Sequence, residues 1–142
     1  MEDLVEDLTR GNVVEVKVVL ASVIAALAVY QLLLISVGYG KVRPRFLGAG
    51  PASTAHRAIG DTIAMVTIAV ALMCLIYFEW DEAGLHAVAG AALLPVLALK
   101  IAVVRQGGRL GRFLPVLGIT VFVLIAVTWA TSAGDFLTDG EP

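Results

Sequence analysis

Charge, cysteine and histidine are all scarce in this sequence, and each scarcity excludes a class of protein. Only 15% of the 142 residues are charged, whereas 59% are hydrophobic, and the mean hydropathy is +0.92. A soluble domain with a water-facing surface does not reach such values. The single cysteine, Cys74, excludes a disulfide within the chain, and the lack of a C-x-x-C-H motif excludes ordinary covalent attachment of a c-type haem. Cys74 stands in apolar mid-helix sequence, and we interpret it as a packing residue.

Long apolar runs dominate what is present. Each is close to the ~20 residues that a bilayer-crossing helix requires. They predict an all-α fold, an integral membrane four-helix bundle that forms a single transmembrane domain over residues 1–142. The acidic N-terminal segment has no small-residue cleavage site, so we expect the first helix to remain in the mature protein. The four predicted helices cover about residues 18–38, 59–78, 85–104 and 113–133.

The charged residues alternate in sign between the connections of the predicted bundle. Lysine and arginine gather in the first and third connections, which the positive-inside rule places in the cytoplasm. Both termini are therefore expected on the extracytoplasmic side of a bacterial cytoplasmic membrane, in a multi-pass protein. Trp80 and Trp129 then fall at the outer interface, where amphipathic aromatic side chains prefer to lie. The basic residues are Lys41, Arg43, Arg45, Arg57, Arg105, Arg109 and Arg112, and the acidic ones outside are Glu2, Asp3, Glu6, Asp7, Glu79, Asp81, Glu82, Asp135, Asp139 and Glu141.

The only two histidines, His56 and His86, are the first candidates for chemistry, because ionisable groups inside a membrane are costly and usually functional. The second and third predicted helices are expected to form a hairpin that turns near Trp80, so depth follows from the distance to the turn at ~1.5 Å per residue. His56 then lies at the cytoplasmic side and His86 at the outer side, roughly the ~30 Å of a hydrocarbon core apart. They cannot ligate the same metal or haem within one chain.

Met73 lies at the depth of His86 across that hairpin, and the two side chains predict a haem site. A thioether and an imidazole are both competent axial ligands of haem iron. Gly90 follows one turn after His86 within a stretch of small residues, and a flat macrocycle needs such a recess. Both features have a structural alternative, because small residues also let membrane helices approach closely and most membrane methionines are packing residues.

Asp61 and Lys100 form a second pair at matched depth, nearer the cytoplasmic boundary. Opposite charges at one depth in a membrane usually pair. We favour a structural ion pair over a proton relay. The alternative is that Lys100 extends to the cytoplasmic interface while Asp61 pairs with Arg57 one turn earlier.

A third group, Ser53, His56 and Arg57, stands at the start of the second helix. Histidine and arginine side chains there can hydrogen-bond a quinone carbonyl or a haem propionate at the cytoplasmic interface. In the structural alternative, Ser53 caps the helix and Arg57 anchors it among the lipid headgroups.

Two short patches resemble the cytochrome b anchor subunits of succinate dehydrogenases. Ser53-x-x-His56-Arg57 is similar to the signature in which the serine and the arginine help to form the quinone site, and His86-x-x-x-Gly90 is similar to the haem-ligand segment. The chain departs from that pattern because Gly90 is not followed by an arginine-containing continuation and because those anchors usually have three helices.

A longer resemblance covers the second to fourth helices and links the chain to an actinobacterial family of small four-helix membrane proteins of unassigned function. That family looks like b-type cytochromes, and many members carry a further histidine at the position of Met73. The resemblance implies redox chemistry, either with His/Met ligation, which tends to raise the haem potential, or with the haem lost and a structural shell kept. The residues that carry it are His56-Arg57-x-x-Gly60, Leu85-His86-x-x-x-Gly90, Ala98-Leu99-Lys100-x-x-Val103-Val104-Arg105, Leu114-Pro115-Val116-Leu117-Gly118 and Trp129-x-Thr131-Ser132.

The leading hypothesis is a membrane b-type haem protein in electron transfer, with one haem b held by His86 and Met73 near the outer face. A quinone near His56 and Arg57 is an optional second cofactor. Such a chain is an electron-transfer protein or a subunit of an oxidoreductase complex rather than a stand-alone enzyme. Its expected partners are membrane lipid and either further copies of itself or a larger respiratory redox complex, with no nucleic acid.

Three alternatives stay open. A homodimer that placed His86 beside its symmetry mate would restore bis-histidine ligation. A non-catalytic accessory subunit of a larger complex would need no haem. A transporter or channel is disfavoured by the lack of internal repeats and broken helices, although Tyr30 and Gln31 could line a pore.

Overall fold

A computed structural model describes residues 2–41, 45–46, 48–77 and 84–139, and the regular structure of these residues is entirely helical. The predicted all-α class is confirmed, and four helices are long and apolar enough to cross a membrane. Several residues of the charge analysis lie outside the described residues: Arg43, Glu79, Trp80, Asp81, Glu82 and Glu141. The helices are α1 (Glu2–Thr9), α2 (Val13–Gly38), α3 (Ala49–Tyr77), α4 (Gly84–Gln106), the 3₁₀-helix η2 (Gly108–Phe113), α5 (Leu114–Trp129), the π-helical turn η3 (Ala130–Gly134) and α6 (Asp135–Asp139).

The helix boundaries follow from local sequence. α3 begins at Ala49 rather than near residue 59, because the segment before the apolar run is rich in alanine and its proline, Pro51, stands in the first turn, where a missing N–H costs nothing. α4 ends at Gln106, where Gly107 and Gly108 have φ values of 64° and 73°. Glycine adopts this left-handed backbone without strain, so the chain reverses there into η2 and α5.

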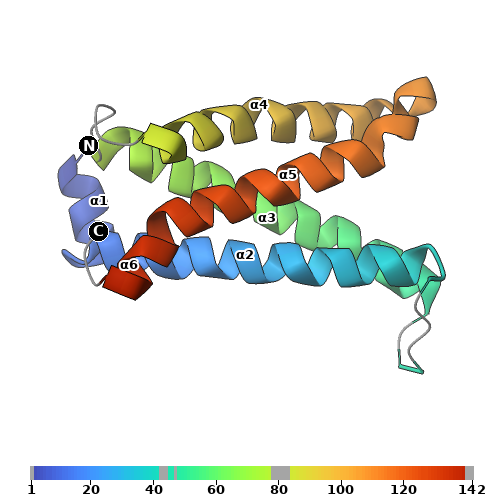
Figure 1. Cartoon of the computed structure of the whole chain (residues 1–142), viewed down its shortest axis with the longest axis horizontal. Coiled ribbons are helices and arrows are strands. Elements are labelled where there is room, and N and C mark those ends of the chain that lie inside the picture. The colour runs from blue at the N-terminus through green and yellow to red at the C-terminus, as the bar shows by residue number, and fades with distance from the viewer. Residues whose placement is uncertain (1, 42–44, 47, 78–83, 140–142) are drawn as a thin grey trace.

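The four long helices run alternately up and down, and both termini lie at the same end of the molecule (Figure 1). We call this the terminal end. The opposite end carries the turn after α2 and the one between α4 and α5, so the described basic residues of these connections gather there, whereas the acidic residues of α1 and α6 lie at the terminal end. This separation of charge is the one that the sequence predicted.

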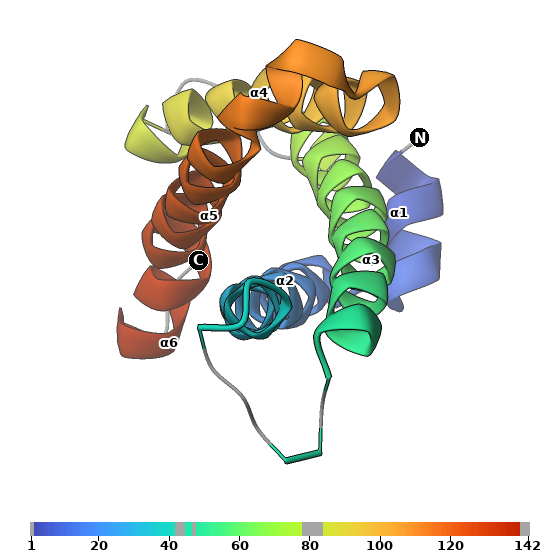
Figure 2. The same ribbon diagram turned by 90° about the vertical axis from the view of Figure 1, so that its right-hand side faces the viewer.

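Helix pairing differs from the expected hairpin. α2 packs along α3 and α4 packs along α5, whereas the consecutive helices α3 and α4 touch only slightly (Figure 2). Glycine explains the first pairing: a Cβ added at Gly38 would stand 3.3 Å from Ser53 Oγ, and one at Gly60 would stand 3.5 Å from Gln31 Nε2. Small residues at such points let membrane helices approach closely. Depth read across an α3–α4 hairpin therefore does not imply contact between side chains.

All four long helices contribute to one apolar core midway along the bundle, while much of the outer surface is also apolar. Met65 is 73% exposed and Val88 is 68% exposed on the outside of the bundle. Large exposed apolar side chains around every long helix are what a lipid environment permits and water does not. The core consists of Ile24, Ala28, Ile63, Ala64, Leu93, Leu97, Val121 and Ile125.

Candidate functional site

A cavity of about 730 Å³ lies between the four long helices, on the terminal side of the core. Core residues Ile24, Leu93 and Ile125 form part of its wall, and Asp135 and Asp139 of α6 also line it. The lining is mostly apolar. The volume falls in the ~300–1,000 Å³ range of cofactor and small-molecule sites. A gap of this size accounts for the slight contact between α3 and α4, which form facing walls.

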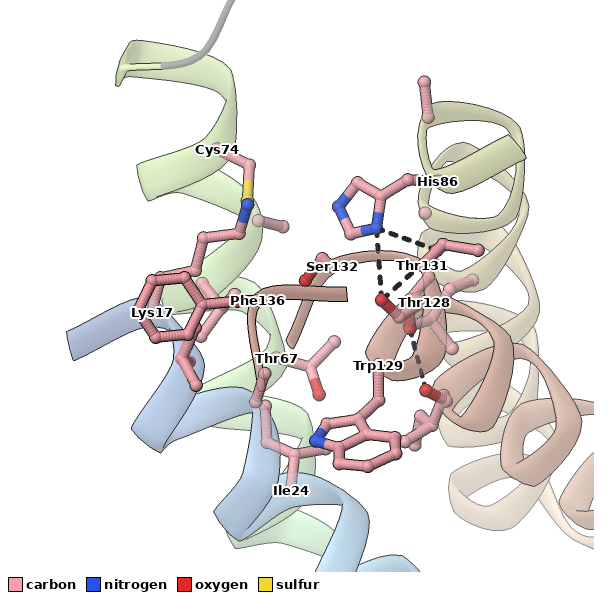
Figure 3. A pocket seen from close by; sticks show the side chains of 18 of the residues that line it. Lys17, Ile24, Thr67, Cys74, His86, Thr128, Trp129, Thr131, Ser132 and Phe136 are labelled. Atoms are coloured by element: carbon pink, nitrogen blue, oxygen red, sulfur yellow. Dashed lines mark hydrogen bonds between the residues drawn. The ribbon is translucent and has the colours of Figure 1, made fainter. Parts of the chain in front are cut away.

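His86 reaches this cavity from the first turn of α4. Its Nδ1 lies 3.1 Å from the carbonyl oxygen of Thr128 and 3.3 Å from Oγ1 of Thr131, both on the next wall (Figure 3). A carbonyl oxygen only accepts hydrogen bonds, so Nδ1 is the donor and carries the proton of the neutral ring. Nε2 then keeps its lone pair. This arrangement, an Nδ1–H bonded to a carbonyl, is the one that orients metal-binding histidines.

The backbone beside His86 departs from regular α-helix. Helix α5 passes into the π-turn η3 at Ala130, two residues after Thr128 and directly before Thr131. π-turns are rare and occur frequently at functional sites, because their wider hydrogen-bonding pattern shifts the carbonyl positions. The hydroxyl of Thr131 donates to the Val127 carbonyl at 2.8 Å, so its oxygen accepts from His86.

Gly90 also lines the cavity, one turn beyond His86. Nothing lies within 4 Å of the point where a Cβ at Gly90 would stand. The predicted recess beside His86 is therefore present.

The wall opposite α4 presents Cys74, and Met73 is not among the lining residues. Thr67, Ala71 and Cys74 follow the i, i+4, i+7 spacing of one helix face, whereas Met73 is turned about 100° from Cys74 around the axis. Lys17 of α2 lines the cavity too and interacts electrostatically with both Cys74 and His86. The structure thus brings His86 together with Cys74 and Lys17 rather than with Met73.

Thr67 is another polar residue among those that line the cavity. It is only 6% exposed, and within the described part of the chain its hydroxyl oxygen has no hydrogen-bond partner. That oxygen is enclosed by protein, so it does not open into the cavity.

Trp129 joins two helices and also lines the cavity. Its indole Nε1 donates to Ser22 Oγ at 3.0 Å, which links α5 to α2 across the bundle. The side chain is half-buried at the last residue of α5, on the terminal side of the core. Ser22 gives the indole N–H the acceptor that a buried tryptophan usually finds.

The second predicted site, at the other end of the bundle, is only partly assembled. His56 is half-buried against α2, and its carbonyl oxygen accepts a hydrogen bond from Gln31 Nε2 at 2.8 Å. Gln31 Oε1 and His56 Nδ1 are both buried and have no partner among the described residues. Ser53 and Arg57 are exposed on α3. Gln31 thus joins α2 to α3.

The predicted ion pair between Asp61 and Lys100 does not form. Asp61 is exposed on α3, whereas Lys100 is half-buried on α4 and interacts electrostatically with His56. The pairing was inferred from depth alone, and α3 and α4 make few contacts with each other.

Comparison with known proteins places the chain in a family. The model of DUF6529, a family of unknown function, matches residues 5–141. The chain belongs to the DUF6529 family. No curated protein and no solved structure shows a significant match to it.

Several residues of this DUF6529 chain that build the cavity were missed from the sequence as candidates: Lys17, Thr67, Cys74, Thr128 and Thr131. Thr131 had a weak signal, since it belongs to the Trp129-x-Thr131-Ser132 motif. The others are single polar or sulfur-containing residues in apolar helices, which usually serve packing, and only the helix pairing separates them from such residues. No three or more His, Cys, Asp or Glu side chains within the described ranges are grouped so that they could hold a bare metal ion.

Proposed function

We propose that the cavity holds a b-type haem and that the protein takes part in electron transfer within the membrane. The observation that carries this proposal is His86, whose Nδ1 is fixed by the Thr128 carbonyl and whose ring borders a cavity of about 730 Å³. A macrocycle supplies its own equatorial ligands, so one fixed imidazole with an adjacent recess at Gly90 fits the chemistry of the group.

Each part of the cavity has a task in this proposal. His86 would hold the haem iron, and the Thr128 carbonyl fixes the orientation of its ring. Lys17, which also lines the cavity, would supply a positive charge for an acidic substituent. The mostly apolar walls, to which all four long helices contribute, would lower the polarity around a bound redox centre. When bound, the haem supplies one-electron oxidation and reduction.

The identity of the second axial ligand stays part of the proposal. Met73, the residue predicted from depth, stands next to the cavity-lining Cys74 but not on the lining itself. A homodimer that brought two copies of His86 together remains a further arrangement for the same haem.

A quinone is the proposed electron partner at the other end of the bundle. The buried and unpartnered atoms Gln31 Oε1 and His56 Nδ1 support a small polar group there, and Arg57 is exposed one residue further along α3. With both termini outside, as the charge distribution predicts, this end faces the cytoplasm. The chain then belongs in a bacterial cytoplasmic membrane.

The test is a dithionite-reduced minus oxidised visible spectrum of the protein purified in mild detergent with added haem. We expect a b-type spectrum with near-stoichiometric haem for the native chain and for His56→Ala. We expect its loss in His86→Ala, because the fixed axial ligand is removed. A flat spectrum of the native chain under these conditions would exclude the haem proposal.

One observation favours the alternative of an accessory subunit without haem. Asp61 is exposed within an apolar helix that is long enough to span the membrane. A carboxylate that faces lipid is costly, and a partner subunit with a matching polar group would remove that cost. If the spectrum is flat, the proteins that co-purify with the native chain but not with Asp61→Leu would identify the complex.

A further inference from the structure

The outer face of α3 carries two opposite charges within a helix that is long enough to span the membrane. Arg57 and Asp61 are both exposed, and they stand one turn apart on the same side of the helix. Asp61 follows Gly60, which approaches Gln31 of α2, and Gln31 lies roughly 10 Å along the axis before that helix ends at Gly38. The short aspartate side chain does not extend over that distance to the end of the helix.

The hydroxyl groups of this face are satisfied, whereas the charges are not. Thr62 Oγ1 donates to the Ala58 carbonyl at 3.1 Å, within the helix itself. Within the described part of the chain, neither the Arg57 nor the Asp61 side chain has a hydrogen bond or an ion pair. A charge that faces lipid is costly. This face therefore needs a partner that brings both a cation and a carboxylate at a matching depth.

Exposed residues around Asp61 also have the spacing of a helix–helix contact. Their separations alternate between four and three residues, which keeps one narrow seam of side chains against a neighbouring helix. We call these residues the α3 seam. None of them lines the cavity, and α3 forms a side of the bundle that no other long helix covers (Figure 2). The α3 seam consists of Thr54, Ala58, Asp61, Met65, Ile68 and Leu72, all of them exposed.

We propose that the α3 seam is the interface between two copies of this chain. Two copies in one membrane share the same orientation, so a twofold axis along the membrane normal sets their α3 helices side by side and parallel. Asp61 then stands at the same depth in both copies. Arg57 lies one turn away, and its long side chain spans that turn to reach Asp61 of the other copy. The face is self-complementary, because the pair of copies forms two reciprocal ion pairs.

The balance of charge favours a second copy over other occupants of the seam. Lipid tails supply neither charge. A second copy supplies one cation and one carboxylate at the depths where the first copy needs them, and twofold dimers are the commonest oligomers of identical chains. The inference goes beyond the proposed function and does not rest on it, because the α3 seam is separate from the cavity that His86 borders.

The deciding experiment is oxidative cross-linking in the membrane, with the single native cysteine removed as Cys74→Ser. In that background one chain carries Met65→Cys on the α3 seam, and a matched control carries Val123→Cys on α5. Both native side chains are exposed and lie at the level of the same apolar core. We expect a cross-linked dimer only from Met65→Cys, because a disulfide requires Cα atoms within ~7 Å of each other.

A charge-complementation test examines the reciprocal ion pairs. Asp61→Arg leaves two cations on the face, and Arg57→Asp leaves two carboxylates. We expect each variant alone to lose the Met65→Cys cross-link by about tenfold or more, because like charges then meet in the interface. A mixture of the two, carrying different tags, should regain it. An ion pair within one chain would be broken in both variants and would not be restored by mixing.

Each outcome decides the proposal, once circular dichroism has shown that the variants are helical. Equal cross-linking of Met65→Cys and Val123→Cys, or none in either, would overturn it. A Met65→Cys product that contains a different protein would assign the seam to a foreign subunit instead. Failure of the mixture to regain the cross-link would reject the reciprocal ion pairs. These readouts do not involve haem, so the proposed function is judged separately by its own spectrum.

Discussion

Each end of the bundle carries one histidine, and the surroundings of the two imidazole rings differ. At the terminal end His86 borders a cavity, and its Nδ1 is held by the Thr128 carbonyl. At the opposite end His56 packs against α2, where its carbonyl oxygen accepts from Gln31 and its buried Nδ1 has no partner among the described residues. Both imidazoles are half-buried.

The difference shows that similar burial leaves the two imidazoles in different surroundings. A metal-binding imidazole needs one nitrogen fixed by an acceptor and space in front of the other. His86 has the acceptor and lies beside the space, whereas the two helices around His56 are in close contact. The sequence allowed the two histidines to be compared only by their predicted depth in the membrane. Depth is a weaker criterion for a ligand than the acceptor and the space around each ring.

The largest expected effect comes from comparing two glycines. Gly90 lines the cavity at the terminal end, whereas Gly60 lies at the contact between α3 and α2. Gly90→Leu places a side chain where nothing lies within 4 Å, so we expect the variant to fold normally and to lose haem binding by tenfold or more. Gly60→Leu extends a side chain into Gln31, whose Nε2 is already 3.5 Å from a Cβ at that position. Overpacking of this kind costs ~1–3 kcal/mol.

Haem titration and thermal unfolding in detergent measure the two effects on both variants. Gly118→Leu is the matched control, because Gly118 also has open space around it but does not line the cavity. Equal haem binding in Gly90→Leu and Gly118→Leu would show that the cavity is not the haem site.

A smaller effect concerns the hydrogen bond that joins α2 to α5 beside the cavity. Trp129→Phe keeps the apolar ring and removes the 3.0 Å hydrogen bond from the indole Nε1 to Ser22 Oγ. Interhelical hydrogen bonds in membranes contribute about 0.6 and at most about 1.7 kcal/mol, so we expect a loss in that range.

Ser22→Ala should lower the free energy of unfolding by a similar amount, and the double variant should lose little more than either single one. These three variants and the native chain form a double-mutant cycle. Additive losses of unfolding free energy would mean that the two side chains stabilise the bundle independently and that the cavity wall does not depend on their hydrogen bond.

The smallest expected effect is at Asp61, which the sequence paired with Lys100. Because Asp61 is exposed and Lys100 lies instead near His56, Asp61→Asn should change the stability of the isolated chain by about 0.5 kcal/mol or less. Thermal unfolding in detergent measures it, with Lys100→Met as the comparison. A loss of several kcal/mol that Lys100→Met rescued would restore the predicted pair.

Much of the fold was predictable because it depends on local composition. Apolar runs of sufficient length specify helices that can span a bilayer, and the glycines after Gln106 specify the turn into η2. His86 and Gly90, which line the cavity, stood out because a histidine in apolar sequence and a glycine one turn away are visible in the sequence. Charge sorting between the two ends was visible for the same reason.

The rest depends on which helix lies beside which. An apolar helix in lipid gains little from any particular neighbour through hydrophobicity, so pairing is decided by close packing at sites such as Gly38 and Gly60. The sequence-based prediction treated the second and third helices as a packed pair. It therefore placed Met73 opposite His86 and Lys100 opposite Asp61. Packing of α3 on α2 turns the face of Cys74 and Thr67 towards the cavity.

By itself, then, the sequence determined a membrane protein of four long helices with one histidine near each end, because hydropathy and charge act residue by residue. Only the tertiary structure decided that α3 and α4 stand apart, that the Thr128 carbonyl fixes the ring of His86, and that Cys74 and Lys17 line the cavity beside it. The physical reason is that helix rotation and partner choice are set by contacts between distant residues, and in an apolar solvent those contacts are almost the only forces that distinguish one helix face from another.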